Sequence, residues 1–586
     1  MSDGALRFTA FWRGVVNARH RLANRYSARM ARFANPPNAF LWQPEPRAVG
    51  SFARANQYAA GNLLFAGKLM QHRGSLWDLR PPTEAYEAEL HGFAWLDDLA
   101  ADGSARSREI AQAWLFDWIH RFGGGSGPGW QPNLAGRRLI GWISHTPFIL
   151  KSVEPANSRI FFRALGRQTR YLARRWRAAD PGLPSVEALT GLVYAGLALE
   201  GQEALLVHAV HDLGRECQRV LNEEGAILSR NPEELMEVFT LLVWAARTLE
   251  EAGKEPDPRH LRAMKSVAPT LRALRMGNGA LARFHGGSVG EEGRLDQALA
   301  DARIRAPARS DQVMGYVRLH AGPVVCVVDA GPPPRGTWAK TGHASTLGVE
   351  VSVGRRPLLG SVGPGRGFGP DWAETGRRTE SHSTVIVERT SSSRFLGRGW
   401  SARRLGNRIV DGPRRVPVEQ TNDLNGAWVL TAHDGYVPTH GLTHERRLFL
   451  STAGDDLRCE DTLSSHDGAQ KKLFDRTVAA APRLGVRFSA VFHIHPDVEA
   501  QLALGRSAVA LRLSNGEVWI FRQSGGTLEL LDALHLDRSH LKPRPSKRIV
   551  VSTSVTSYRG QLNWGLKRAE PSGLAEGDSR TAVQRV

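Results

Sequence analysis

The sequence predicts a multidomain α and β protein, in which a helical N-terminal half precedes an antiparallel β-sandwich. Up to about residue 275, apolar residues recur with helical spacing, and only short loops interrupt the pattern. From about residue 310, short alternating segments follow one another with turn residues between them, which is typical of antiparallel sheets. A chain of 586 residues is also too long for a single core.

The helical half is predicted from six segments that show the pattern most clearly. They span residues 107–121, 156–178, 185–200, 203–223, 232–252 and 258–275. The last segment opens with Pro256-Asp257-Pro258, which is a helix-start signal. Consecutive helices with short loops predict a bundle, a solenoid or a toroid. Residues 276–310 contain Gly277-Asn278-Gly279 and Gly286-Gly287, and we expect them to cross over to the second half.

The β half is predicted from short segments separated by turns such as Ser514-Asn515-Gly516-Glu517. In residues 347–353, apolar and polar residues alternate, so we expect a half-buried strand. The other expected strands are residues 313–319, 324–329, 384–388, 428–432, 446–450, 518–521 and 548–553. The predicted organisation is a basic N-terminal segment (1–40), a helical domain (41–275), a crossover linker (276–310), a β-sandwich (311–565) and a polar tail (566–586).

The composition favours a polyanionic partner. The net charge of +19 suits nucleic acid, anionic lipid or acidic polysaccharide. The chain has no zinc-finger spacing, RNA-binding aromatic motif or clear DNA-reading helix, so we expect no specific nucleic-acid site. Its three cysteines, Cys217, Cys326 and Cys459, are far apart and imply neither a disulfide framework nor a CxxC metal site.

The first 40 residues hold seven arginines and one acidic residue, Asp3. The arginines are Arg7, Arg13, Arg19, Arg21, Arg25, Arg29 and Arg32. This segment fits a basic amphipathic helix that contacts an anionic membrane or glycan, or a solvated helix that packs on its own domain. We find no secretory signal pattern and no apolar run of about 20 residues, so the expected location is cytoplasmic, with a periplasmic location as the alternative.

Two histidines stand at expected strand entrances, His343 in Gly342–Leu347 and His382 in Arg377–Thr384. These segments, in order with Phe93–Leu99, Trp130–Trp142, Arg230–Glu234 and Val491–Val498, resemble the heparinase II/III family of polysaccharide lyases. The resemblance implies an incomplete (α/α) toroid joined to an antiparallel β-sandwich. It also implies β-elimination of an anionic, uronate-containing polysaccharide, so an acidic polysaccharide is the expected partner.

The implied reaction needs a screened uronate carboxylate, a base and an acid, for which tyrosine and histidine are the usual residues. Active relatives commonly carry a tyrosine in the segment that matches residues 225–235, but this chain has none there. Thr341 also stands where a first histidine often precedes the His343 position. The alternative to a lyase is therefore a catalytically inactive protein on the same scaffold, which binds glycan or assembles envelope polysaccharide.

Candidate site residues follow from the resemblance and from local chemistry. We expect Tyr194, His145 and His382 as catalytic candidates, although Tyr194 also fits a core-edge aromatic residue and His145 a satisfied interior histidine. Arginines pair with carboxylates and tryptophans stack on sugar rings. The expected substrate contacts are therefore Trp130, Arg137, Arg138, Trp142, Arg366 and Arg377, with Arg366 in a glycine-rich loop (363–369) that no helix is expected to follow.

A structural zinc is a further implication, because His343 and His382 match positions that help to hold zinc in some relatives. Two imidazoles, a carboxylate and a water would suit the metal. No acid lies in Leu359–Gly363, where the family carboxylate falls, and Asp371 and Glu374 are displaced from it. A two-histidine hydrogen-bonded site is the alternative. His493-Ile494-His495 places two further rings on one strand face, and the family pattern favours a structural role for them.

Overall fold

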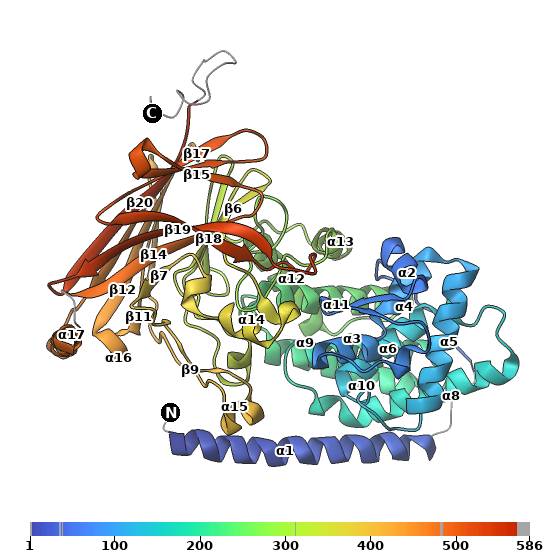
Figure 1. Ribbon diagram of the computed structural model, residues 1–586. Coiled ribbons are helices and arrows are strands. Elements are labelled where there is room, and N and C mark those ends of the chain that lie inside the picture. The colour runs from blue at the N-terminus through green and yellow to red at the C-terminus, as the bar shows by residue number, and fades with distance from the viewer. Residues whose placement is uncertain (1–2, 34–36, 38, 311, 481–484, 571–586) are drawn as a thin grey trace.

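The computed structural model describes residues 3–33, 37, 39–310, 312–480 and 485–570, and helices give way to strands along the chain (Figure 1). The expected polar tail lies outside these residues from 571 onward. The helical half comprises α1 (Asp3–Met30), α2 (Phe52–Ala59), α3 (Glu84–Gly92), α4 (Ala94–Asp102), α5 (Ala105–Phe122), α6 (Pro132–Ser144), α7 (Thr146–Ile149), α8 (Pro155–Arg175), α9 (Leu183–Ala198), α10 (Glu203–Val220), α11 (Pro232–Glu251), α12 (Pro258–Ala273) and α13 (Arg294–Asp301). A hairpin of β1 (Asn62–Phe65) and β2 (Lys68–Gln71) interrupts them. All six expected helices are confirmed to within a few residues.

Helix starts follow from local side-chain chemistry. The side chain of Asn231 accepts hydrogen bonds from the backbone N–H groups of Glu233 and Glu234, and Asp257 caps α12 through Arg259 N–H. Thr83 and Ser104 cap α3 and α5 in the same way. Proline occupies the first turn of α6, α8, α9, α11 and α12, where its missing N–H costs nothing.

The centre of the helical half is a close crossing of α6 and α9. Gly136 and Gly191 face each other there, so that a β-carbon on Gly191 would stand 2.5 Å from the α-carbon of Gly136. A β-carbon on Gly136 would in turn stand 2.3 Å from the carbonyl oxygen of Glu187. Because neither position tolerates a side chain, the two backbones are in direct contact. Every residue of α9 from Ser185 to Ala198 is buried as a result.

Helix α1 lies along one side of the molecule, beneath both halves (Figure 1). It packs against α8 of the helical half and against α15 (Trp400–Leu405), a short helix inserted in the β half. Its buried residues are mostly small and include Ala10, Gly14 and Ala28. Its large apolar residues are exposed instead: Phe8, Phe11, Trp12, Val15, Val16, Leu22 and Tyr26. The outer face of α1 is thus the more apolar one, the reverse of an ordinary surface helix.

The β half forms two large antiparallel sheets. The first has the strand order β10 (Val418–Asn422), β11 (Gly426–Tyr436), β12 (Leu442–Ser451), β13 (Asp456–Ser464), β20 (Arg559–Arg568), β17 (Val518–Ser524), β16 (Ala508–Arg512) and β15 (Glu499–Ala503). The second has the order β18 (Thr527–His535), β19 (Arg544–Val555), β14 (Val486–Ile494), β6 (Arg356–Gly360), β5 (Val349–Val353), β4 (Val324–Asp329) and β3 (Tyr316–Ala321), with β7 (Val385–Val387) beside β14. The predicted helical half and antiparallel β half are confirmed.

Two local expectations are wrong. Strand β5 is buried on both faces, because the crossover covers its polar side: Arg283 N–H donates to Glu350, and Gly277 N–H donates to Ser352. A short helix, α14 (Pro370–Thr375), also follows the glycine-rich loop, where no helix was expected. Proline at its first position favours this turn.

Candidate functional site

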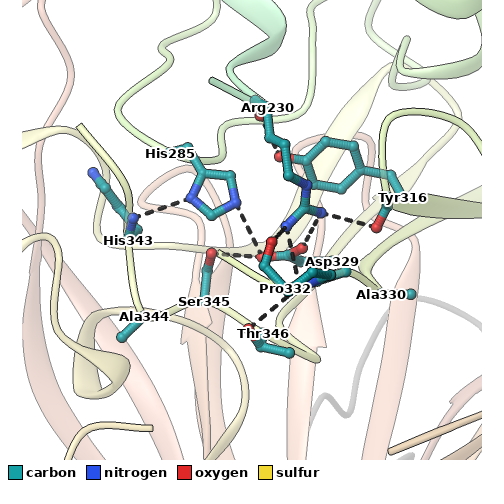
Figure 2. Close-up of polar contacts among 12 residues, drawn as sticks. Arg230, His285, Tyr316, Asp329, Ala330, Pro332, His343, Ala344, Ser345 and Thr346 are labelled. Carbon is teal, nitrogen blue, oxygen red and sulfur yellow. Dashed lines mark hydrogen bonds and ion pairs between the residues drawn. The ribbon is translucent and has the colours of Figure 1, made fainter. Parts of the chain in front are cut away.

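A buried polar cluster lies where the helical half meets the β half, around the carboxylate of Asp329 (Figure 2). Asp329 ends β4 and has no solvent exposure. Its Oδ1 accepts a hydrogen bond from Arg230, just before α11, at 2.5 Å. Its Oδ2 accepts one from Ser345 Oγ at 2.6 Å and lies 3.5 Å from His285 Nε2. The carboxylate thereby joins three segments that are far apart in the sequence.

All the guanidinium N–H groups of Arg230 form hydrogen bonds at this junction. Besides Asp329, it donates to the carbonyl oxygens of Met314, Gly315, Gly331 and Pro332 at 2.8–3.1 Å. Its guanidinium carbon lies 4.7 Å from the centre of the Tyr316 ring, and the Tyr316 hydroxyl donates to the Arg230 carbonyl oxygen. Because all five guanidinium donors have partners, none remains for a substrate. Arg230 therefore connects the helical half to the β half.

Three histidines extend the cluster away from Asp329. His343 N–H donates to His285 Nδ1 at 3.0 Å, and the ring centres of His343 and His382 are 5.3 Å apart. All three side chains are buried, with exposed fractions of 0%, 5% and 2% for His285, His343 and His382. His343 Nδ1 and both ring nitrogens of His382 have no hydrogen-bond partner.

Burial sets the protonation state of these rings. It lowers the pKa of His285 and of His343 well below the usual 6.5, assisted by neighbouring positive groups. It lowers the pKa of His382 to about 3. The imidazoles are therefore neutral near pH 7. Because the rings are sealed from solvent, proton exchange with a bound sugar would require the junction to open.

The residues present do not fit a structural zinc ion. His343 and His382 offer bare nitrogens, but zinc in such a site takes at least three protein ligands. The segment Leu359–Gly363, near which the resemblance places the family carboxylate, contains no acidic residue. Within the described part of the chain, no group of three histidine, cysteine or acidic side chains is placed to hold a metal.

The segment that lacks the family tyrosine presents carboxylates instead. Glu233 accepts hydrogen bonds from Ser288 N–H and Ser288 Oγ, both at 2.9 Å, and from Arg538 of the β half at 3.2 Å. Glu234 accepts one from Leu183 N–H. Burial raises the pKa of Glu234, while Ser229, Leu183 and the charge of Arg366 oppose this rise.

More ion pairs surround these two carboxylates. Arg137 donates to Glu187 at 2.6 Å, and Arg294 lies 2.8 Å from Glu237. Burial raises the pKa of Glu237 as well, and Arg294 opposes this. The part of the helical half that faces the β half is therefore crowded with paired charges of both signs.

The structure does not bring the catalytic candidates together. Tyr194 lies inside α9 with 1% exposure, its hydroxyl accepting from Thr248 Oγ1 at 3.1 Å. Burial raises the pKa of Tyr194 to about 12, which makes it a poorer base. His145 caps the end of α6 and binds Asp97 Oδ1 at 2.7 Å. The partners of Tyr194 and His145, Thr248 and Asp97, belong to the helical half, whereas His382 belongs to the β half.

Three expected sugar contacts are corrected to core residues. Trp142 has no exposure and stacks on Phe161, so it cannot stack on a sugar. Arg138 has none either and donates to Gln168 and to the carbonyl oxygen of His91. Trp130 is 4% exposed, with its indole N–H on the carbonyl oxygen of Phe122. The tryptophan-rich segment belongs to the helical core.

The other three arginines have different surroundings. Arg137 is partly exposed but paired with Glu187, and Arg366 is exposed on the glycine-rich loop. Arg377 donates to the carbonyl oxygens of Gly342, Ala339 and Asn407, so it holds the backbone before His343. Of the arginines that we expected at a substrate, only Arg366 keeps an exposed side chain.

Sequence reasoning missed His285 and Asp329. His285 stands in the crossover directly before Gly286-Gly287, and it has a positive φ of 49°. A histidine next to a glycine pair in a linker is the sequence feature by which His285 could have been found. Asp329 ends an otherwise apolar strand, Val324–Asp329, and a carboxylate at the end of a buried strand is costly unless it is paired.

Comparison with known proteins supports the fold. Residues 303–565 match the family described as "Heparinase II/III-like, C-terminal". The chain resembles heparinase III with a TM-score of 0.67 at 12% identity, covering 87% of this chain and 83% of that one. It resembles a mutant of a heparan sulfate lyase from Pedobacter heparinus with a TM-score of 0.58 at 13% identity, covering 95% and 89% of the two chains. Identities this low show the fold alone.

A sequence relative covers nearly the whole chain. FtsZ-localized protein C of Caulobacter vibrioides is 30% identical over 544 residues, which are 90% of this chain and 91% of the relative. The similarity therefore spans the helical half as well as the β half.

Proposed function

We propose a role for this chain from the premise that it belongs to the heparinase II/III family. The proposed role is that of a catalytically inactive assembly protein, which acts at an anionic membrane surface beside the FtsZ division machinery. The observation that carries the proposal is the apolar outer face of α1, which has arginines beside it. The scaffold that presents this face differs from active relatives at the positions of the acid and the base.

The loss of catalysis is inferred from the junction. Tyrosine is absent from residues 225–235, and Glu233 and Glu234 occupy the start of α11. The β-domain histidines His343 and His382 are neutral near pH 7 and buried. A lyase needs a base that reaches the proton next to the uronate carboxylate. The tyrosine and histidine side chains described at the junction, Tyr316, His285, His343 and His382, are all buried.

The membrane surface is inferred from α1 and its neighbours. The exposed fractions of Phe8, Trp12, Leu22 and Tyr26 are 66%, 51%, 66% and 67%. Trp400 on the adjoining α15 adds a further aromatic residue that is 43% exposed. Helix α8, which packs on α1, adds the exposed arginines Arg159, Arg163, Arg170 and Arg174. Aromatic residues on one face with flanking arginines are typical of helices that lie in an anionic interface.

Peripheral contact is the relevant kind of membrane contact. Within the described residues, no helix combines the length and the apolar character that a membrane span requires. The relative is named for its localization with FtsZ, and we extend this association to the present chain as part of the proposal.

Vesicle sedimentation tests the membrane part of the proposal. We expect the full chain to pellet with vesicles of phosphatidylcholine and phosphatidylglycerol (3:1) and not with phosphatidylcholine alone. Replacing Phe8, Phe11 and Trp12 together by Ala should reduce binding more than tenfold, because each buried aromatic side chain contributes about 1.5–3 kcal/mol. Leu424→Ala, at a hairpin tip with 97% exposure, is the matched control. Wild-type protein that stays in the supernatant would overturn this part.

The association with FtsZ needs its own assay. Purified FtsZ filaments should recruit the protein to vesicles, or be recruited by it, in the presence of GTP. Vesicle-bound protein that leaves FtsZ in solution would limit the proposal to the membrane.

A uronate lyase is the second candidate, and it is supported by the fold shared with heparinase III. Ultraviolet absorbance of unsaturated uronate during incubation with heparinoid, alginate, hyaluronate and native exopolysaccharide separates the two candidates. We expect no rise from folded protein. A rise that His382→Ala abolishes would establish the lyase and reject the inactive assembly protein.

A further inference from the structure

A cavity of ≈ 50 Å³ with a mixed polar and apolar lining lies between the crossover and the second sheet. Its polar lining includes Arg283, Glu350, Ser361, His493, His495 and His535. Five of these six residues, all except His495, have side chains that are about nine-tenths buried or more. At about 30 Å³ per water, the volume has room for one or two waters, or for a small group at the end of a larger molecule.

His493 presents a bare acceptor. Its Nε2 lies 2.8 Å from the carbonyl oxygen of Glu380, which can only accept, so the proton is on Nε2. Nδ1 is therefore unprotonated, and it is buried without a hydrogen-bond partner. Burial lowers the pKa of His493 to about 4, so the ring is neutral near pH 7. A buried acceptor of this kind needs a donor that the protein does not supply.

The other two histidines present donors. His535 Nε2 lies 3.0 Å from Arg283 Nη1, which can only donate, so the proton of this ring is on Nδ1. His495 Nδ1 lies 3.3 Å from Asp497 N–H and 3.5 Å from Asp497 Oδ2, and the shorter contact, in which Nδ1 accepts, places the proton on Nε2. The ring centres of His495 and His535 are 5.2 Å apart. The cavity thus combines one imidazole acceptor with two imidazole donors.

This pattern disfavours an anion and a metal ion. Arg283 is already committed: its guanidinium donates to His535 and to the carbonyl oxygen of Ser361, and it lies 3.8 Å from Glu350. The carboxylate of Glu350 and the bare His493 nitrogen would repel an oxyanion. A metal ion needs several bare nitrogens or carboxylates, and the described residues hold no such group of three.

We propose that this cavity binds a hydroxyl group of a small polyol or of a sugar. The hydroxyl hydrogen is donated to His493 Nδ1, and the hydroxyl oxygen accepts from His495 Nε2–H and His535 Nδ1–H. A hydroxyl group has one donor and two acceptor lone pairs, which complements the three rings. The site is independent of the membrane face, and its occupancy does not depend on the proposed function.

Saturation-transfer NMR on the full chain tests the proposal with two probes, glycerol for a free polyol and methyl β-D-glucopyranoside for a sugar. We expect transfer to at least one probe, and the stronger signal identifies the source. His493→Phe and His495→Ala should each weaken binding at least tenfold. His540→Ala, an exposed histidine outside the cavity lining, should leave binding unchanged.

The contrary outcomes are equally definite. Absence of transfer from folded wild-type protein would mean that the cavity holds only water. Transfer that both cavity variants retain would place the ligand elsewhere. Stoichiometric zinc in the purified protein that is lost in His493→Phe would assign the cavity to a metal. If His493→Phe fails to fold, His495→Ala still decides, because the His495 side chain is 16% exposed at the rim.

Discussion

At the residue scale, Arg230 shows how one side chain fastens two halves of a molecule. Its five contacts cross from the start of α11 to the segments that flank β3 and β4. Arg230→Met removes them and leaves the Asp329 carboxylate buried beside an apolar group. A buried charge without its partner typically costs about 3–5 kcal/mol.

We therefore expect Arg230→Met to lower the free energy of unfolding by about 3–5 kcal/mol, measured by urea denaturation. The double variant Arg230→Met with Asp329→Asn should recover part of this loss, because no unpaired charge remains. Equal losses in the single and the double variant would show that the ion pair is not the cause.

The buried histidines make stability dependent on pH. Each of His285, His343 and His382 takes up a proton near pH 6.5 when unfolded, whereas burial holds the folded pKa lower, at about 3 for His382. Below pH 6.5 the unfolded state therefore binds more protons. The stability that neutral burial contributes is complete above pH 6.5 and is lost as the pH falls toward 3, by about 1.4 kcal/mol per histidine for each pH unit.

Urea midpoints between pH 7.5 and 5 measure this slope. His382→Gln should reduce the slope by up to about 1.4 kcal/mol per pH unit, the share of one histidine, while other buried histidines such as His260 and His493 keep the remainder. His208→Gln, at an exposed position on α10, is the control and should leave the slope unchanged. Identical slopes in His382→Gln and in the wild type would contradict the assignment.

At the element scale, α6 and α9 pack closely because Gly136 and Gly191 have no side chains where the two helices cross. Gly136→Ala would place a β-carbon 2.3 Å from a carbonyl oxygen of α9, so α6 and α9 would have to separate. We expect a loss of about 1–3 kcal/mol or more in thermal or urea unfolding, as overpacking typically causes. Gly141→Ala on the same helix meets only a leucine methyl at 3.8 Å and should be neutral or slightly stabilising.

Helices and most central strands were predictable because their cause is local. Periodicity, N-caps and first-turn prolines lie within each segment, and the six helix predictions agree with the structure to within a few residues. The second buried face of β5 was not predictable, because it is covered by Arg283 and Gly277 from a different element. Alternation of apolar and polar residues cannot reveal that a polar face is covered.

The candidate site was less predictable for the same reason. His343 and His382 were found from a motif, and the structure places them in the junction. Trp142 and Arg138 were expected at a sugar because of their residue types, but their depth in the helical half depends on packing that no local pattern encodes. His285 joins the site through contacts with Asp329 and His343, which lie 44 and 58 residues further along the chain.

At the scale of the whole molecule, the net charge of +19 makes binding to an anionic surface sensitive to salt. Exposed charges are screened over about 10 Å at 0.1 M ionic strength and about 3 Å at 1 M. We expect the fraction bound to phosphatidylglycerol vesicles to fall steeply between 50 mM and 500 mM NaCl. A bound fraction that does not change over this range would mean that the apolar face of α1 is sufficient by itself.

Helix α1 has a consequence for how the two halves communicate. It touches α8 on one side and α15 on the other, so its position depends on how the halves are set against each other. A membrane or partner that binds the outer face of α1 therefore affects both halves. By thermodynamic linkage, if one arrangement of the two halves binds a surface more tightly through α1, then binding to that surface favours this arrangement. Helix α1 thus couples binding at its outer face to the relative arrangement of the two halves.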